Sequence, residues 1–137
     1  MAYNGAQDLV NLMIEEIQNH KKLELCDELF AENFINYTPP ANIANNREGI
    51  RQVFSMTHVA FPDGHITVKD QISDGKKVWT RKVFAGTLTG ALGAIAPTGK
   101  TITYEVIDIL SVQDDKITEH WSVIDRLNLM RQLGQIV

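Results

Sequence analysis

The sequence predicts an α+β fold in which helices cover one face of a curved sheet. In the first half of the chain, apolar residues recur at helical spacing, and from residue 65 onward four segments alternate like strands. Tight connections at Asp74-Gly75 and at residues 113–115 join two pairs of these strands, so those neighbours should be antiparallel. Helices followed by a long run of strands are typical of α+β domains.

The elements of the first half follow from apolar spacing and from turn residues. Val10, Met13 and Ile17 recur every three to four residues, which predicts a helix. The elements that we expect here are a helix over residues 6–20, a short helix over 25–31, a brief strand over 33–37, and a helix from 47 to about 59. Pro39 and Pro40 open the loop before the last helix, which Asn45 or Asn46 can cap.

The second half is predicted to form the rest of the sheet and one final helix. Its expected strands cover residues 65–72, 77–88, 101–112 and 116–125, and a short helix follows over 126–133. A glycine-punctuated apolar loop over residues 89–99 separates the second of these strands from the third. Since we find neither a repeat nor a linker, residues 1–137 are expected to form a single domain, and 44% hydrophobic residues suffice for its core.

Composition excludes several classes of partner. A net charge of -4 and a pI near 5.5 argue against binding to nucleic acids or to anionic membranes. No apolar run approaches the ~20 residues of a membrane span, and the N-terminus does not resemble a signal peptide, so we expect a cytoplasmic protein. The lone Cys26 cannot form an internal disulfide and is expected to be a buried structural thiol.

Asp125 is the first candidate for chemistry, because it lies where the last strand meets the last helix. In a regular strand, one face presents Ile117, Glu119, Trp121, Val123 and Asp125, and the other presents Thr118, His120, Ser122 and Ile124. If the first face lines a cavity, Asp125 becomes an acid or base in an apolar surround with a raised pKa. The alternative, which composition alone favours, is that Asp125 caps the helix.

Asp108 is the one charged residue in an otherwise apolar row of its predicted strand. We expect it to pair with Arg81 on the preceding strand; the alternative is a second carboxyl in a pocket. His120 is expected to point away from the Asp125 face and to have at most a minor role. No pair of histidines has the spacing of a metal site, so no metal is expected.

Six short strings, taken in order, indicate a family. They are Phe34-Ile-Asn-Tyr-Thr-Pro-Pro40, Arg47-Glu-Gly-Ile-Arg51, Phe61-Pro-Asp63, Pro97-Thr-Gly-Lys100, Asp115-Lys-Ile-Thr-Glu-His-Trp121 and Arg131-Gln-Leu-Gly134. With them the chain closely resembles, over essentially its whole length, the SnoaL-like polyketide cyclases, also described as predicted ester cyclases. The resemblance implies the cone-shaped fold of ketosteroid isomerase and scytalone dehydratase, in which a strongly curved sheet and helices enclose an apolar pocket.

The resemblance also implies a mechanism, an aldol condensation that closes a ring within one substrate molecule without cofactor or metal. An aspartate in the terminal strand serves as general acid and base, and Asp125 matches it here. The partner is then a small hydrophobic or aromatic molecule, and the chain is expected to form a homodimer or homotetramer through the open sheet face. The substrate-binding residues that we expect are Tyr37, Phe54, Trp79, Tyr104, Trp121 and Val123, with Asp108, His120 and Arg81 as secondary polar residues.

Two departures from the family pattern point to a different or less polar substrate. Leu88 stands where many members have a histidine, and Ser111 stands where an arginine is common. The alternatives are an isomerase-like or dehydratase-like enzyme, a non-catalytic binding module, and a structural domain whose pocket is filled by Trp79, Trp121 and Phe84.

Overall fold

The computed structural model describes residues 5–136 of the chain. Its helices are α1 (Ala6–Leu12), the π-helix η1 (Met13–Asn19), the 3-10 helix η2 (Leu23–Leu25), α2 (Cys26–Leu29), α3 (Arg47–Ala60) and α4 (Arg126–Gln132). Its strands are β1 (Phe30–Asn36), β2 (His65–Ser73), β3 (Lys77–Thr87), β4 (Thr101–Gln113) and β5 (Lys116–Ile124). The predicted α+β class is confirmed, and each predicted element has a counterpart.

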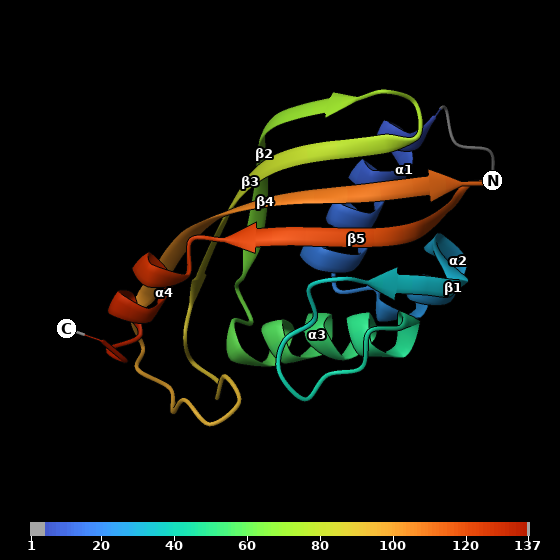
Figure 1. Cartoon of the computed structure of the whole chain (residues 1–137). Coiled ribbons are helices and arrows are strands. Elements are labelled where there is room, and N and C mark those ends of the chain that lie inside the picture. Colours follow the sequence, from blue (N-terminus) through green and yellow to red (C-terminus); the bar gives the residue numbers. More distant parts are fainter. Residues whose placement is uncertain (1–4, 137) are drawn as a thin grey trace.

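The five strands form one mixed, strongly curved sheet in the order β1-β5-β4-β3-β2. Neighbours from β2 to β5 are antiparallel, whereas β1 runs parallel to β5 at the edge. In Figure 1, α1 and the adjoining η1 lie behind the long strands, and α3 crosses below them. The helices and the curved sheet together therefore enclose the interior from one side, as the resemblance implied.

Helix α3 begins and ends as its sequence predicts. The Asn46 side chain accepts a hydrogen bond from the Gly49 amide at 2.9 Å, which makes Asn46 the N-cap. Ile50 and Phe54 are buried on its inner face. A Cβ on Gly49 would lie 1.9 Å from the Ala44 carbonyl oxygen, so the loop before the helix can pack this closely only against glycine.

The N-terminal region differs from the prediction at one junction. The helix predicted over residues 25–31 ends at Leu29, because Phe30 already pairs with Ile117 as the first residue of β1. The Phe30 and Phe34 rings meet edge to face at 4.9 Å in the core. Their burial in the sheet outweighs the weak helical preference of this short segment.

The hydrophobic core has two parts, one beneath the N-terminal helices and one near α4 and the end of α3. Cys26 is fully buried in the first part, and burial raises the pKa of its thiol to about 11. A thiol that stays protonated at neutral pH is a packing element rather than a nucleophile.

Candidate functional site

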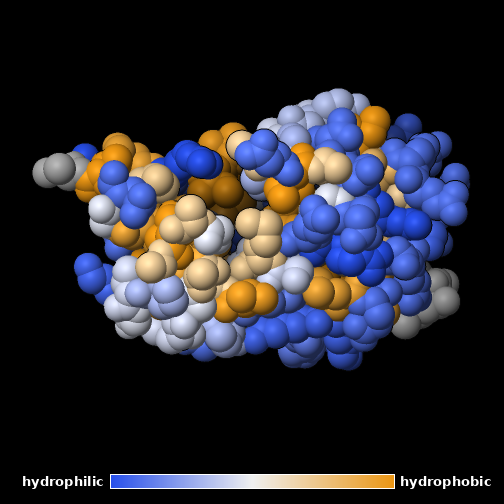
Figure 2. All heavy atoms as spheres, turned by 90° about the horizontal axis from the view of Figure 1, so that it is seen from below, coloured by the Kyte–Doolittle hydropathy of each residue, from blue (hydrophilic) through white to orange (hydrophobic). Residues whose placement is uncertain are grey.

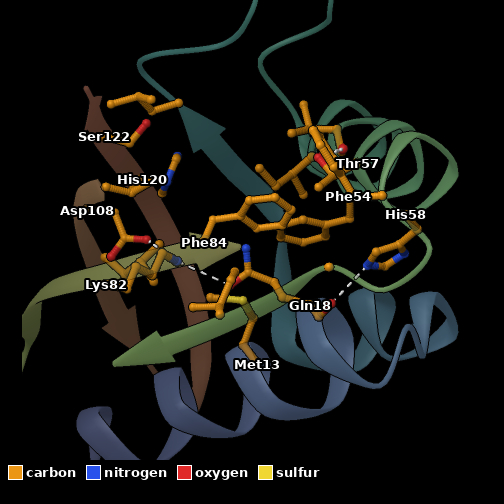
Figure 3. Close-up of a pocket in the computed structure, with 18 of the residues that line it drawn as sticks. Met13, Gln18, Phe54, Thr57, His58, Lys82, Phe84, Asp108, His120 and Ser122 are labelled. Atoms are coloured by element: carbon orange, nitrogen blue, oxygen red, sulfur yellow. Dashed lines mark hydrogen bonds and ion pairs between the residues drawn. The ribbon is translucent and has the colours of Figure 1, made fainter. Parts of the chain in front are cut away.

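A cavity of about 160 Å³ lies between the inner face of β3, β4 and β5 and the helices η1 and α3. Figure 3 shows apolar rings from α3 and the sheet in its middle, with polar groups to either side. The face of the molecule in Figure 2 has a hollow whose visible walls are mainly hydrophobic. The residues that line the cavity are Met13, Gln18, Phe30, Ile50, Val53, Phe54, Thr57, His58, Phe61, Gly64, Ile66, Lys82, Phe84, Tyr104, Val106, Asp108, Leu110, His120, Ser122 and Ile124.

The end of strand β5 does not face the cavity in the way that regular alternation predicts. The opposite face of the strand lines the cavity. Ser111 pairs with Glu119, but Val112 pairs with Ile117, so β5 contains one extra residue at this point. Such a bulge shifts the alternation by one residue. Ile117 is therefore buried, and beyond the bulge His120, Ser122 and Ile124 line the cavity.

Asp125 lies outside the cavity. Its side chain is exposed and accepts a hydrogen bond from the Asn128 amide at 3.3 Å, which makes it the N-cap of α4. The expectation that Asp125 lies in an apolar cup is wrong, because it rested on unbroken alternation through β5. The position corresponds to the alternative interpretation, a helix cap.

A buried ion pair joins β3 and β4 at the cavity wall. Lys82 Nζ lies 2.6 Å from Asp108 Oδ2, and their side chains are only 5% and 3% exposed. In the pairing of the two strands, Lys82 lies opposite Val106, and Thr80 lies opposite Asp108. Lys82 and Asp108 are therefore diagonal neighbours on the same face. Asp108 Oδ1 has no hydrogen-bond partner among the described residues.

The expected pairing of Asp108 with Arg81 is wrong. Arg81 faces outward, because adjacent residues of a strand point to opposite faces. Its guanidinium instead contacts Asp70 at 2.8 Å and Glu105 at 2.6 Å on the outer surface.

His120 is held in one orientation beside this ion pair. Its Nδ1 lies 2.9 Å from Asn36 Oδ1, and the same oxygen accepts a hydrogen bond from the Thr38 amide at 3.0 Å. Because that oxygen is an acceptor, Nδ1 carries the proton and Nε2 is left with a free electron pair. Burial lowers the pKa of His120 to about 4; Asp108 opposes this shift and Lys82 adds to it. The imidazole is therefore neutral at pH 7.

The π-helix η1 brings Gln18 to the other side of the cavity. Gln18 Oε1 accepts a hydrogen bond from Lys82 Nζ at 3.2 Å, and the Gln18 carbonyl accepts one from His58 Nε2 at 3.1 Å. Burial lowers the pKa of His58, so this second histidine is also neutral at pH 7. One residue thus holds both a lysine from β3 and a histidine from α3, which Figure 3 shows as dashed contacts.

Aromatic rings form much of the apolar wall. Phe84 packs against Phe61 at 5.0 Å and against Tyr104 at 5.1 Å between ring centroids, and Phe54 packs against Phe30 at 6.1 Å. Burial raises the pKa of Tyr104 to about 12, so its phenol stays protonated. Of the predicted site residues, Phe54, Tyr104, Asp108 and His120 meet at this cavity.

The remaining predicted residues lie on the outer face of the sheet or at its edge. Tyr37 stacks on Trp121 with 4.9 Å between ring centroids, and its hydroxyl donates to Glu119 at 3.1 Å. Val123 is 73% exposed, and Trp79 borders a shallow outer depression together with Arg81. Trp79 and Trp121 therefore do not fill the interior, contrary to what the structural-domain alternative required.

Sequence reasoning missed Lys82, Gln18 and His58. For Lys82 a signal was present, since Val78, Thr80, Lys82 and Phe84 share the buried face of one strand, where an unpaired lysine is unfavourable. Gln18 and His58 gave no such signal, because polar residues on amphipathic helices are normally solvent-exposed.

Two further observations concern the part of the chain that the structure describes. No three His, Cys, Asp or Glu residues within 5–136 gather in a way that could hold a metal ion. Within the same range, no helix has both the length and the hydrophobicity that are needed to cross a membrane.

Comparison with known proteins identifies the family. The model of the SnoaL-like polyketide cyclase family matches residues 8–133, so the chain belongs to this family. None of the curated proteins matches it significantly.

Solved structures have the same fold. A putative polyketide cyclase from Bacillus cereus is 33% identical, with a TM-score of 0.76 over 88% of this chain and 75% of that one. IdmH, a putative polyketide cyclase from Streptomyces antibioticus, is 30% identical, with a TM-score of 0.80 over 93% and 97% of the two chains. TsrD from Streptomyces laurentii is 25% identical, with a TM-score of 0.84 over 95% of each.

Proposed function

We propose that this member of the SnoaL-like polyketide cyclase family is a cofactor-free acid–base enzyme that closes a ring by an aldol reaction within one substrate molecule. The observation that supports this most is the neutral His120 in the cavity beside the buried pair of Lys82 and Asp108. Together these groups provide a base, a hydrogen-bond donor for a carbonyl oxygen and a counter-charge.

The first step is proton abstraction next to a carbonyl. His120 Nε2 takes the proton from carbon, and the electron pair of the C–H bond moves to the carbonyl oxygen as an enolate forms. Lys82 has three N–H groups, of which two are directed at Asp108 and Gln18, so the third can donate to this oxygen. The Asp108 carboxylate favours the imidazolium that forms on His120, and the Lys82 ammonium opposes it.

The second step forms the ring. The enolate carbon attacks a second carbonyl of the same substrate, and the resulting alkoxide takes the proton back from His120. No atom is gained or lost, as an aldol addition requires. Holding both ends of the substrate close together contributes to the rate in addition to the proton transfer.

The test is a proton-exchange assay that needs no knowledge of the natural substrate. In D₂O, the wild-type protein should accelerate exchange of the methyl protons of acetophenone, followed by NMR. His120→Gln should lower this rate by ~10² or more, the usual contribution of a positioned base. Asp125→Asn is the matched control and should exchange at the wild-type rate.

Two results would contradict the proposal. One is exchange that His120→Gln leaves unchanged in a protein whose circular dichroism shows it to be folded. The other is saturable binding of acetophenone by the wild type without any accelerated exchange, which is the behaviour of a non-catalytic binding module.

A further inference from the structure

The cavity is small for a member of a family named after polyketide cyclisation. Its volume of about 160 Å³ is close to that of an engineered protein cavity of about 150 Å³ that holds one benzene molecule. Sites for drug-sized ligands usually measure about 300–1,000 Å³. The space within the cavity therefore matches one six-membered ring rather than several fused rings.

The walls of the cavity resist widening. Phe54 and Phe84 are only 7% and 5% exposed, and each packs against a further buried ring. Phe54 lies on α3 and Phe84 on β3, so the space between them is bounded by a helix on one side and by the sheet on the other. Interiors that are packed in this way keep their shape, because displaced rings lose their contacts with neighbouring side chains.

Among the described residues that line the cavity, none offers an unpaired cation to an anionic substrate. Its charged lining residues are Lys82 and Asp108, whose charges cancel at 2.6 Å, while His58 and His120 are neutral. A carboxylate that entered would lose its hydration and meet no unpaired positive group, which is unfavourable. A neutral carbonyl oxygen needs only one donor, and Lys82 retains one N–H for it.

We propose that the part of the substrate that enters this cavity is a neutral carbonyl compound the size of a single six-membered ring. This inference rests on the function proposed above and specifies its substrate class. Ring closure in this cavity would then produce one ring, from an open-chain ester or ketone rather than from a free acid.

The experiment compares three probes on the wild-type protein by isothermal titration calorimetry. Acetophenone has one ring and a neutral carbonyl, benzoate has one ring and a negative charge, and 2-acetylanthracene has a neutral carbonyl and three fused rings. Acetophenone should bind saturably, and the other two should bind at least about tenfold more weakly. The proposal is wrong if acetophenone does not bind, or if either of the other probes binds equally well or more tightly.

A variant tests whether cavity size causes the preference. Phe54→Leu should narrow the difference in affinity between 2-acetylanthracene and acetophenone by several-fold. Phe34→Leu removes a buried ring that does not line the cavity and should leave the wild-type preference unchanged. If neither variant folds, the comparison of the three probes on the wild-type protein still tests the proposed substrate class.

These measurements also separate the substrate class from the reaction. Binding of the probes involves no proton transfer, so an exchange rate that is insensitive to His120→Gln would reject the proposed function while the probe preference stands. Tight binding of the fused-ring probe would reject the substrate class while the role of His120 stands.

Discussion

At the residue scale, the proposed chemistry depends on a few polar side chains that are held in a largely apolar cavity. Asn36 fixes the tautomer of His120, and Gln18 fixes the position of Lys82. Asp108 is the counter-charge to Lys82. Each of these roles predicts a measurable effect on stability or titration.

The lowered pKa of His120 predicts acid destabilisation. Between its unfolded pKa of about 6.5 and its folded pKa of about 4, the unfolded chain binds a proton that the folded chain excludes. The free energy of unfolding should therefore fall as the pH decreases through this window, by about 2 kcal/mol for this residue at pH 5, while the contribution of His120 should be nearly constant above pH 7.

Urea denaturation at pH 7 and pH 5 measures this effect. His120→Gln should lose part of the difference between the two pH values, while the contributions of His58 and of the surface carboxylates remain. Equal pH dependence in the two proteins would show that His120 is not kept neutral by burial.

The ion pair of Lys82 and Asp108 predicts strong coupling between two substitutions. Lys82→Met leaves a buried carboxylate unpaired, and Asp108→Leu leaves a buried ammonium unpaired, so each should cost about 3–5 kcal/mol. The double variant removes both charges and should be much more stable than the sum of the single effects predicts. Chemical denaturation of the four proteins gives the coupling energy, and additive effects would contradict the pairing.

At the element scale, the bulge in β5 decides which side chains enter the cavity. Between Ile117 and His120, the bulge reverses the face of the sheet to which the following side chains point. Glu119, Trp121 and Val123 therefore lie on the outer surface. Asp125 then caps helix α4, which begins at Arg126, and lies outside the cavity. The π-helix η1 has a comparable effect on the other wall, where it presents Gln18 to both β3 and α3.

Asp125 is expected to stabilise α4 without taking part in the reaction. Asp125→Ala should lower the free energy of unfolding by about 1 kcal/mol, the usual effect of losing an N-cap, whereas Asp125→Asn should have almost no effect. Both variants should retain the wild-type exchange rate with acetophenone. Loss of exchange in a folded Asp125→Asn protein would instead restore Asp125 as the base.

At the scale of the whole molecule, the sheet has two differently used faces. The inner face borders the cavity, while the outer face has a row of neighbouring apolar side chains, formed by Ile72, Trp79, Ile109 and Trp121 in register across four strands. Ile72 and Val123 are 68% and 73% exposed. Trp79, Ile109 and Trp121 are half-buried, and apolar rows with exposed ends of this kind are typical of surfaces between subunits.

This outer row supports the prediction of a homodimer or homotetramer formed through the sheet. Ile72→Glu combined with Val123→Glu should convert the oligomer to a monomer, because charges would be buried without partners. Val59→Glu on α3, at a position that is 61% exposed, is the control and should leave the mass unchanged. Light scattering after size-exclusion chromatography measures the mass, and a monomeric wild type would contradict the prediction.

The sequence by itself determined the fold class, the approximate extent of the helices and strands, and the family. Helical spacing, strand alternation and turn residues are local properties, so they can be recognised without knowing what packs against them. The cap at Asn45 or Asn46 and the antiparallel pairing of β2 with β3 and of β4 with β5 were predictable for this reason, whereas the pairing of β3 with β4 across the longer loop was not. Phe54 and Tyr104, which the sequence also suggested as substrate-binding residues, line the cavity.

Only the tertiary structure decided which polar groups meet in the cavity. The bulge in β5 depends on pairing with β4, and the parallel contact of β1 with β5 brings Asn36 to His120 across 84 positions of the chain. The partner of Asp108 depended on the register between β3 and β4, which places Lys82 on its face and Arg81 on the other. A one-residue change in register reverses the face of every later side chain, and single-strand periodicity cannot detect it.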